Sequence, residues 1–275
     1  MLSVITVCLN CKNDIEKTMI SVLSQKDADI EYIIKDGGSD DGTNEIIERV
    51  LSDAPNDRIK AVHICEPDEG IYDAMNKASE LATGDHVIFM NAGDVFYDEF
   101  VVRDAGLYFD GGADILFGNT LYTMPLCFFP QLHFADRDRD TLSIGHQSCI
   151  YSSKILEKYR FDTKYKIAAD HDQLQKIFRD GNSFTHMNLF VSICNREGVS
   201  NQRSTAHFDE VYMIGHDGRL EKDGRYFMAL LSWKVRTAMA KMFPMLENKR
   251  YCLNNLKRNQ FALPKNFSSS IKHRQ

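Results

Sequence analysis

Residues 32–43 read YIIKDGGSDDGT, a short apolar run that ends in a polar, glycine-rich turn. The run Tyr32-Ile33-Ile34 is typical of a strand buried on both faces. Glycines let a ligand approach the backbone closely, and a carboxylate here can accept a hydrogen bond from a ribose hydroxyl or a base N–H. The turn is equally well explained as a tight loop in which Asp41 or Thr43 caps the following helix.

The alternation of strand and helix extends over the first hundred residues. Apolar, β-branched runs predict strands at 4–7, 32–34, 59–64 and 86–90. Apolar residues at helical spacing predict helices at 15–23, 46–51 and 71–82. We expect Gly84 to end the last of these helices as a C-terminal cap. Strands that alternate with helices in this way predict βαβ units, and therefore an α/β protein with a mostly parallel central sheet.

The pattern loosens after about residue 110. Residues 114–117 and 190–194 have the composition of strands, and a helix is expected from Asp170 to Arg179, ending at Gly181. Residues 121–134 are aromatic and contain prolines, so we expect an irregular segment there.

The whole-chain composition excludes several classes of protein. The 275 residues are 43% hydrophobic and 26% charged, as in an ordinary globular protein, and the net charge of -6 argues against a nucleic-acid partner. No apolar run is long enough to span a membrane, and the first ten residues lack the basic start of a signal peptide. Seven cysteines fit a reducing, cytoplasmic compartment. Cys8 and Cys11 form a C-x-x-C that predicts either a redox pair or two small residues at the end of a strand.

The end of the chain differs from the rest in charge. Residues 219–275 contain thirteen Lys and Arg and three Asp and Glu, a net charge of +10, so the remainder carries -16. Within them, Phe227, Leu231, Val235, Met239 and Met242 form one helical stripe. A basic helix with such a stripe predicts either peripheral contact with an anionic membrane at its inner face, or packing on the preceding domain with a solvated basic side.

Polar residues follow three of the predicted strands. Asp36 to Thr43, Glu66 to Gly70 and Asn91 to Asp94 all fall where a strand ends, and parallel strands end at the same edge of a sheet, where ligands bind. Asp94 can hold Mg²⁺ or Mn²⁺ beside a diphosphate, because two anions repel unless a cation lies between them. The alternative is a helix cap.

A second carboxylate cluster, Asp170 and Asp172, lies at the start of the helix predicted over 170–179. The helix dipole stabilises a carboxylate at this position as the anion, so it is available as a base at neutral pH. Simple helix capping explains the same residues.

Taken together, these motifs resemble the inverting family 2 glycosyltransferases with the GT-A fold, such as those of bacterial polysaccharide biosynthesis. The motifs DGGSDDGT at 36–43, EPDEGIYDAMNK at 66–77 and ATGDHVIFMNAGD at 82–94 carry the resemblance, and GHQS at 145–148 and AADHD at 168–172 match more weakly. The resemblance implies a Rossmann-like sheet flanked by helices. It also implies a GT-A domain over 1–205, with a nucleotide-binding half at 1–100 and an acceptor half at 101–205. Residues beyond about 206 lie outside the resemblance, and their charge and helical spacing predict a basic helical extension at 206–275.

The resemblance further implies roles for single residues. Donor-binding positions fall on Asp36, Gly37, Asp68 and Asn91. Acceptor- or sugar-binding positions fall on His146 and Gln147. The metal position falls on Asp94, and the general base on Asp170. Two departures stand out: Asn91 and Gly93 replace carboxylates of the usual D-x-D-D metal motif, and Ala169 replaces the acidic neighbour of Asp170, which leaves Asp172 as an alternative base.

We therefore expect an enzyme that uses Mn²⁺ or Mg²⁺ to transfer a sugar from a nucleotide-sugar, preferably a UDP-sugar, to a glycan or lipid-linked acceptor. A nucleotidyltransferase is the nearest rival enzyme, but it would carry a basic glycine-rich loop after the first strand, where this chain has Cys8 to Lys12. A non-catalytic nucleotide-sugar-binding protein is the second alternative.

Overall fold

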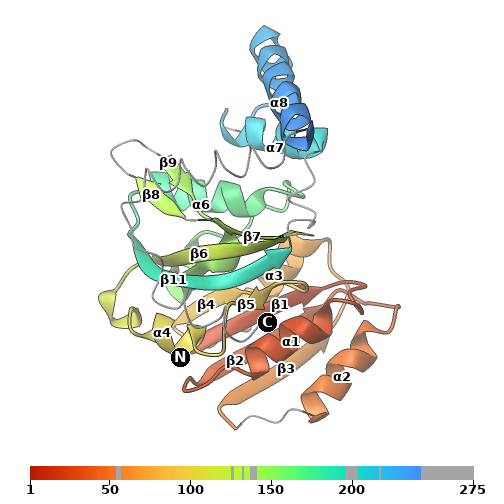
Figure 1. Ribbon diagram of the computed structural model, residues 1–275, viewed down its shortest axis with the longest axis vertical. Helices are drawn as coiled ribbons and strands as arrows, with labels where there is room; N and C mark the ends of the chain where they lie inside the picture. Colours follow the sequence, from red (N-terminus) through yellow and green to blue (C-terminus); the bar gives the residue numbers. More distant parts are fainter. Residues whose placement is uncertain are drawn as a thin grey trace.

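The computed structural model describes residues 1–53, 57–124, 127–131, 133–136, 141–195, 204–216 and 218–242. A central sheet of nine strands in these residues has the order β3-β2-β1-β4-β10-β6-β11-β5, with β7 paired to β6 (Figure 1). Its strands are β1 (Leu2–Cys8), β2 (Ile30–Asp36), β3 (Ile59–Cys65), β4 (His86–Phe89), β5 (Val95–Phe96), β6 (Ile115–Met124), β7 (Cys127–Gln131), β10 (Cys149–Ser152) and β11 (Phe184–Asn195). A separate small hairpin joins β8 (Phe134–Asp136) to β9 (Thr141–Ser143).

The first half of the sheet is parallel, as the sequence predicted. β1 lies between β2 and β4, with Leu2 opposite both Ile30 and His86, and β2 continues the parallel pairing to β3. All seven residues of β1 are buried, which explains its continuous apolar composition. This register brings Cys8, Asp36 and Cys65 side by side at the carboxyl edge.

The second half mixes directions. β10 runs antiparallel to both β4 and β6, whereas β11 runs parallel to β6. The expectation of an irregular segment over 121–134 was wrong, because β6 continues to Met124 and pairs with β7, with Leu121 opposite Pro130. β7 has β6 as its only strand partner among the described residues. A proline, which has no N–H to donate, is tolerated on an edge strand of this kind.

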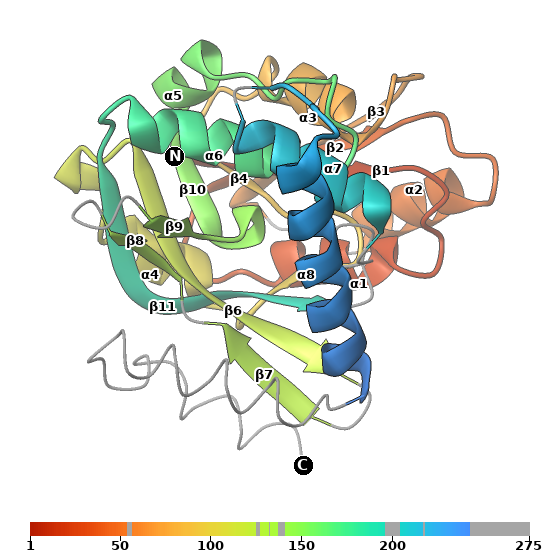
Figure 2. The same cartoon turned by 90° about the horizontal axis from the view of Figure 1, so that it is seen from above.

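Helices cover both faces of the sheet (Figures 1 and 2). They are α1 (Ile15–Leu23), α2 (Thr43–Asp53), α3 (Ile71–Ser79), α4 (Val101–Gly106), α5 (Ser153–Lys158) and α6 (Ala169–Arg179), with short 3-10 turns η1 (Phe109–Gly111) and η2 (His146–Ser148). One core joins α1, α2 and α4 to one face of the sheet, and a second joins α3, α5 and α6 to the other. β1 serves both cores, because Val4 faces the first and Ile5 the second.

The prediction that Gly84 caps a helix was wrong. α3 ends at Ser79, and the backbone φ of Gly84 is not in the left-handed region. A Cβ at Gly84 would lie 2.6 Å from Ser3 Oγ and 2.8 Å from the Met1 carbonyl oxygen. Gly84 is therefore required by the close approach of this turn to the start of β1.

Two helices follow the sheet: α7 (Thr205–Ile214) and α8 (Gly224–Met242). α8 rises away from the sheet in Figure 1 and crosses over the molecule in Figure 2. The helical extension that the sequence predicted is thus present over the part of 206–242 that the structure describes, and the basic residues beyond 242 lie outside it. None of the described helices is long and apolar enough to cross a membrane.

Candidate active site

The carboxyl end of β2 forms a tight turn around Asp36. Its side chain is fully buried, and Oδ1 accepts hydrogen bonds from the backbone N–H of Gly38 at 2.8 Å and of Ser39 at 2.6 Å. Oδ2 accepts from Ser39 Oγ at 2.6 Å and from Cys8 Sγ at 3.3 Å. Burial alone would raise the pKa of Asp36, but the hydrogen bonds from Ser39 and Gly38 outweigh it and lower that pKa. In this conformation the carboxylate of Asp36 stabilises its own turn through these hydrogen bonds.

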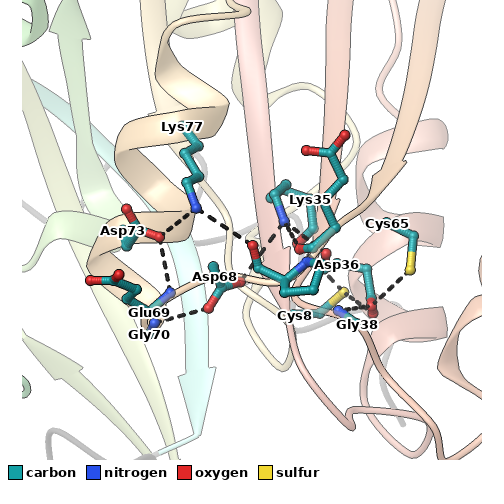
Figure 3. A network of polar contacts seen from close by, with 12 residues as sticks. Cys8, Lys35, Asp36, Gly38, Cys65, Asp68, Glu69, Gly70, Asp73 and Lys77 are labelled. Carbon is teal, nitrogen blue, oxygen red and sulfur yellow. Dashed lines mark hydrogen bonds and ion pairs between the residues drawn. The ribbon is translucent and has the colours of Figure 1, made fainter.

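A buried lysine holds the neighbouring loop, which follows β3 (Figure 3). Lys35 is 2% exposed, and its Nζ donates to the carbonyl oxygens of Asp36 and Glu66 and lies 3.9 Å from Asp68 Oδ2. A buried ammonium needs such partners, since an unpaired one is costly to desolvate. Asp68 Oδ1 also accepts from Gly70 N at 2.9 Å. Lys35 thus fixes Asp68 beside the turn that contains Asp36.

Gly37 and Asp68, both expected to contact the donor, lie against each other. A Cβ at Gly37 would be 2.5 Å from Asp68 Oδ2, closer than any side chain allows. The glycine at this position therefore permits the close approach of the β2 and β3 loops.

The loop after β4 presents Asn91 and Asp94. Burial raises the pKa of Asp94 to about 6, although nearby His146 and hydrogen bonds from Cys194 and Gln147 partly oppose this rise. Asn91 is 9% exposed, and its Oδ1 is buried with no hydrogen-bond partner. Asp94 is a partly buried carboxylate without a full counter-charge, and the unpaired amide oxygen of Asn91 lies on the same short loop. A divalent cation would satisfy both groups. No cluster of three or more His, Cys, Asp or Glu suited to a metal occurs in the described residues.

His146 and Asp170 form a hydrogen-bonded pair across the site. Nδ1 of His146 lies 2.8 Å from Oδ2 of Asp170, and its Nε2 lies 3.4 Å from Asn91 Nδ2. The hydroxyl of Tyr72 donates to Asp170 Oδ1 at 2.9 Å. Burial would raise the pKa of Asp170, but His146 and Tyr72 lower it to about 2. The same pair raises the pKa of His146 against the opposing effect of burial.

The side chain of Asp172 lies away from these groups and has a different partner. It is 5% exposed, and its Oδ2 pairs with Lys176 at 2.7 Å, one turn along α6. The structure therefore brings Asp170, His146, Gln147, Asn91 and Asp94 together and leaves Asp172 in a salt bridge of its own.

The sequence interpretation missed Lys35 and Tyr72, because a lysine inside an apolar run and a tyrosine in a helix carry no local signal of their contacts. It also left the C-x-x-C open. Cys8 and Cys11 are free thiols, and burial followed by the charge of Asp36 raises the pKa of Cys8. A redox thiol needs a lowered pKa, so the pair fits the reading of two small residues at a strand end.

A half-parallel sheet with carboxylates at its carboxyl edge, and a carboxylate–histidine pair beside them, agrees with the GT-A fold that the sequence motifs led us to expect. A family model described as Glycosyl transferase family 2 matches residues 3–179, more than half of the chain. The chain therefore belongs to glycosyl transferase family 2.

A relative agrees with this assignment, and two solved structures share the fold. A PGL/p-HBAD biosynthesis glycosyltransferase of Mycobacterium bovis is 26% identical over 202 residues, covering 72% of this chain and 78% of the relative. The structure of S. aureus TarS 1–349 in complex with UDP-GlcNAc has a TM-score of 0.63 at 19% identity, covering 93% and 79% of the two chains. That of the mannosyltransferase PcManGT from Pyrobaculum calidifontis with GDP-Man and Mn²⁺ has a TM-score of 0.59 at 16% identity, covering 98% and 83%. At these identities the two structures show the shared fold alone.

Proposed function

We propose that this glycosyltransferase inverts the anomeric centre as it transfers a sugar from a nucleotide-sugar, with UDP-sugars the preferred class, to a glycan or lipid-linked acceptor. The observation that carries the proposal is the connected set Asp94, His146 and Asp170 at the sheet edge, beside the loops of Asp36 and Asp68. A relative named for PGL/p-HBAD biosynthesis and a fold neighbour bound to UDP-GlcNAc support the choice of acceptor and donor classes.

Asp170 is the proposed general base. Its pKa of about 2 keeps it anionic at neutral pH, so it can take the proton of an acceptor hydroxyl as that oxygen attacks the sugar. His146 is the rival base, since its imidazole is oriented by a carboxylate. The side chain of Asp170 is 19% exposed and that of His146 10%, so the carboxylate is the easier group for an acceptor to reach. One displacement from the face opposite the leaving group gives a β-linked product from an α-linked donor.

Asp94 and Asn91 are the residues that would hold Mg²⁺ or Mn²⁺. Both ions prefer oxygen ligands and keep several water or phosphate oxygens, so one carboxylate and one amide oxygen suffice from the protein. Such an ion would supply charge neutralisation for the departing diphosphate. This role agrees with the raised pKa of Asp94 and the unpaired Asn91 Oδ1.

On the donor side, Gly37 and Asp68 form the proposed wall of the nucleotide pocket, and Asp36 and Lys35 hold that wall in shape. His146 and Gln147 were expected to bind acceptor or sugar. Their contacts with Asp170 and Asp94 favour a role in orienting these two carboxylates.

Peripheral contact with an anionic membrane through α8 is the final part of the proposal. Five apolar side chains on this helix are at least half exposed: Phe227, Met228, Leu231, Val235 and Met239. Lys234 and Arg236 are exposed beside them. An exposed apolar stripe with basic neighbours is typical of helices that lie in a membrane interface.

A thermal-shift screen of nucleotide sugars, each with Mn²⁺ and with EDTA, tests the donor assignment. We expect UDP-sugars to stabilise the chain more with Mn²⁺ than with EDTA, because binding to the folded state alone raises the melting temperature. Release of free UDP would then exclude a non-catalytic binding protein, and release of pyrophosphate from a nucleoside triphosphate and a sugar phosphate would indicate a nucleotidyltransferase instead.

A further inference from the structure

A carboxylate from α7 holds the segment that precedes α6, the helix that contains Asp170. Glu210 Oε1 accepts a hydrogen bond from the backbone N–H of Lys166 at 2.8 Å, and its Oε2 accepts from the N–H groups of Ile167 and Ala168, each at 2.9 Å. Three successive N–H groups thus converge on one side chain more than forty residues further along the chain. Hydrogen bonds to an ionised carboxylate are roughly twice as strong as those between neutral groups.

The position of this cluster explains why an anion is favoured. Ala168 is the N-cap residue of α6, and its methyl side chain offers no hydrogen bond to the start of the helix. The N-terminus of a helix carries partial positive charge and unsatisfied N–H groups. Glu210 supplies from another element the negative charge that the local sequence lacks.

The same segment contains the proposed base. Tyr72 Oη lies 2.8 Å from the Ile167 carbonyl oxygen and 2.9 Å from Asp170 Oδ1, so its single proton is shared between the segment and the carboxylate. Residues 166–170 are therefore held by Glu210 through their N–H groups, by Tyr72 through a carbonyl and by His146 through Asp170. A shift of this segment would change the distance of Asp170 from both Tyr72 and His146.

Glu210 is in turn fixed by the packing of α7 on α8. The hydroxyl of Tyr226, a residue 2% exposed, donates to Asp209 at 2.7 Å. The rings of Tyr212 and Tyr226 pack edge to face with centroids 5.2 Å apart, and those of Phe208 and Trp233 are 5.4 Å apart. The place of Glu210 therefore depends on the C-terminal helices as a unit.

We infer that Glu210 is a positioning residue for Asp170, which makes α7, and α8 through it, part of the machinery that aligns the base. This inference rests on the proposed function, since it takes Asp170 as the base. We assign Glu210 no contact with donor or acceptor. It acts only through the segment 166–170.

A double-mutant cycle tests whether Glu210 acts through Asp170. Glu210→Gln keeps the size of the side chain but replaces one acceptor oxygen with an NH₂ group that faces the backbone N–H groups. With UDP-glucose, UDP-galactose and UDP-N-acetylglucosamine as probes, we expect kcat for UDP release to fall about tenfold or more, as for a misplaced catalytic group, with an unchanged Kd for UDP. In an Asp170→Asn background the same change should cost nothing further. An equal loss in both backgrounds, or no loss in either, would overturn the inference.

A second measurement reads the position of Asp170 without turnover. Crystal structures of Glu210→Gln and of the unmodified chain are compared. We expect the distances from Asp170 to His146 Nδ1 and to Tyr72 Oη, 2.8 and 2.9 Å in the unmodified chain, to lengthen in Glu210→Gln. They should stay unchanged in the control Glu221→Gln, an exposed glutamate between the two helices. Unchanged distances in folded Glu210→Gln would contradict the positioning role. Full activity of Asp170→Asn would instead reject the base assignment, and the distances would still decide the placement.

Discussion

Each carboxylate of the site has an environment that suits a different task. Asp36 is closed into its own turn, Asp94 is partly buried with an incomplete counter-charge, and Asp170 is paired with a histidine and a tyrosine. Their pKa values are accordingly lowered, raised to about 6 and lowered to about 2. Residue type alone does not separate these roles, because the sequence shows only an aspartate at the end of a strand or the start of a helix.

The two aspartates of α6 should differ sharply in their effect on turnover. Asp170→Asn should reduce kcat by about 10²–10⁴, the usual contribution of a general base, with little change in the Kd for UDP. Asp172→Asn is the matched control, since it removes a carboxylate that pairs with Lys176, and it should leave kcat within a few fold. Steady-state UDP release measures both. If Asp172→Asn showed the larger loss, Asp172 would be the base.

Asp94 should make stability depend on pH in the metal-free chain. Because burial raises its pKa from 3.8 to about 6, the fold favours the protonated form, and the stability it contributes is complete below about pH 4 and lost as the pH rises through 6. The free energy of unfolding, measured in EDTA, should therefore fall by about 2–3 kcal/mol more between pH 4 and 7 than that of Asp94→Asn. Mn²⁺ should reduce this fall, since the cation stabilises the anionic form. Identical pH profiles for the two chains would show that Asp94 has an ordinary pKa.

At the scale of elements, the sequence predicted what is local. The strands β1 to β4 and the helices between them follow from apolar periodicity, and the shared edge of parallel strands brings Asp36, Asp68 and Asp94 to one side. The hairpin of β6 and β7 was missed, since a proline such as Pro130 argues against a strand unless the strand lies at the edge of a sheet. The pairs His146–Asp170 and Glu210–Ile167 were also beyond prediction, because they join elements whose separation in sequence says nothing about contact.

The close approach of the loops that follow β2 and β3 can be tested by substitution of Gly37. Gly37→Ala places a Cβ against Asp68 Oδ2, so the two loops must separate. We expect the binding free energy of UDP to weaken by about 1–3 kcal/mol, the cost of disturbing a charged hydrogen-bonded group. The circular dichroism spectrum should stay that of the unmodified chain. Gly106→Ala is the control, because a Cβ there meets no atom within 4 Å. Equal UDP affinity of Gly37→Ala and the unmodified chain would exclude this loop contact from the donor pocket.

At the scale of the whole molecule, charge is divided between two parts of the sequence. The chain before residue 219 carries -16 and the remainder +10. α8 extends beyond the sheet (Figure 1), and Phe227, Leu231 and Val235 on it are at least half exposed. An enzyme whose acceptor is attached to a lipid would gain from such a division, since the basic helix can meet an anionic surface while the acidic domain stays clear of it.

Vesicle binding tests this arrangement. The unmodified chain should co-sediment with vesicles that contain phosphatidylglycerol at low salt and detach at high salt. The double variant Leu231→Gln, Val235→Gln should bind at least about tenfold more weakly, because both side chains would otherwise be buried in the interface. Ile20→Gln is the matched control, being 50% exposed like Val235 but located on α1. Equal binding of all three chains would remove α8 from the membrane contact.

We propose that Asp94 and Asp170 serve one transfer reaction at the edge of the sheet. The rate of UDP release from the three UDP-sugars in the presence of Mn²⁺, measured for the unmodified chain, Asp94→Asn and Asp170→Asn, decides whether they do. We predict release by the unmodified chain and a loss of at least about 10²-fold in each variant, the scale of losing one catalytic group. Undiminished release by either variant, or release by the unmodified chain that EDTA leaves unchanged, would exclude this shared role.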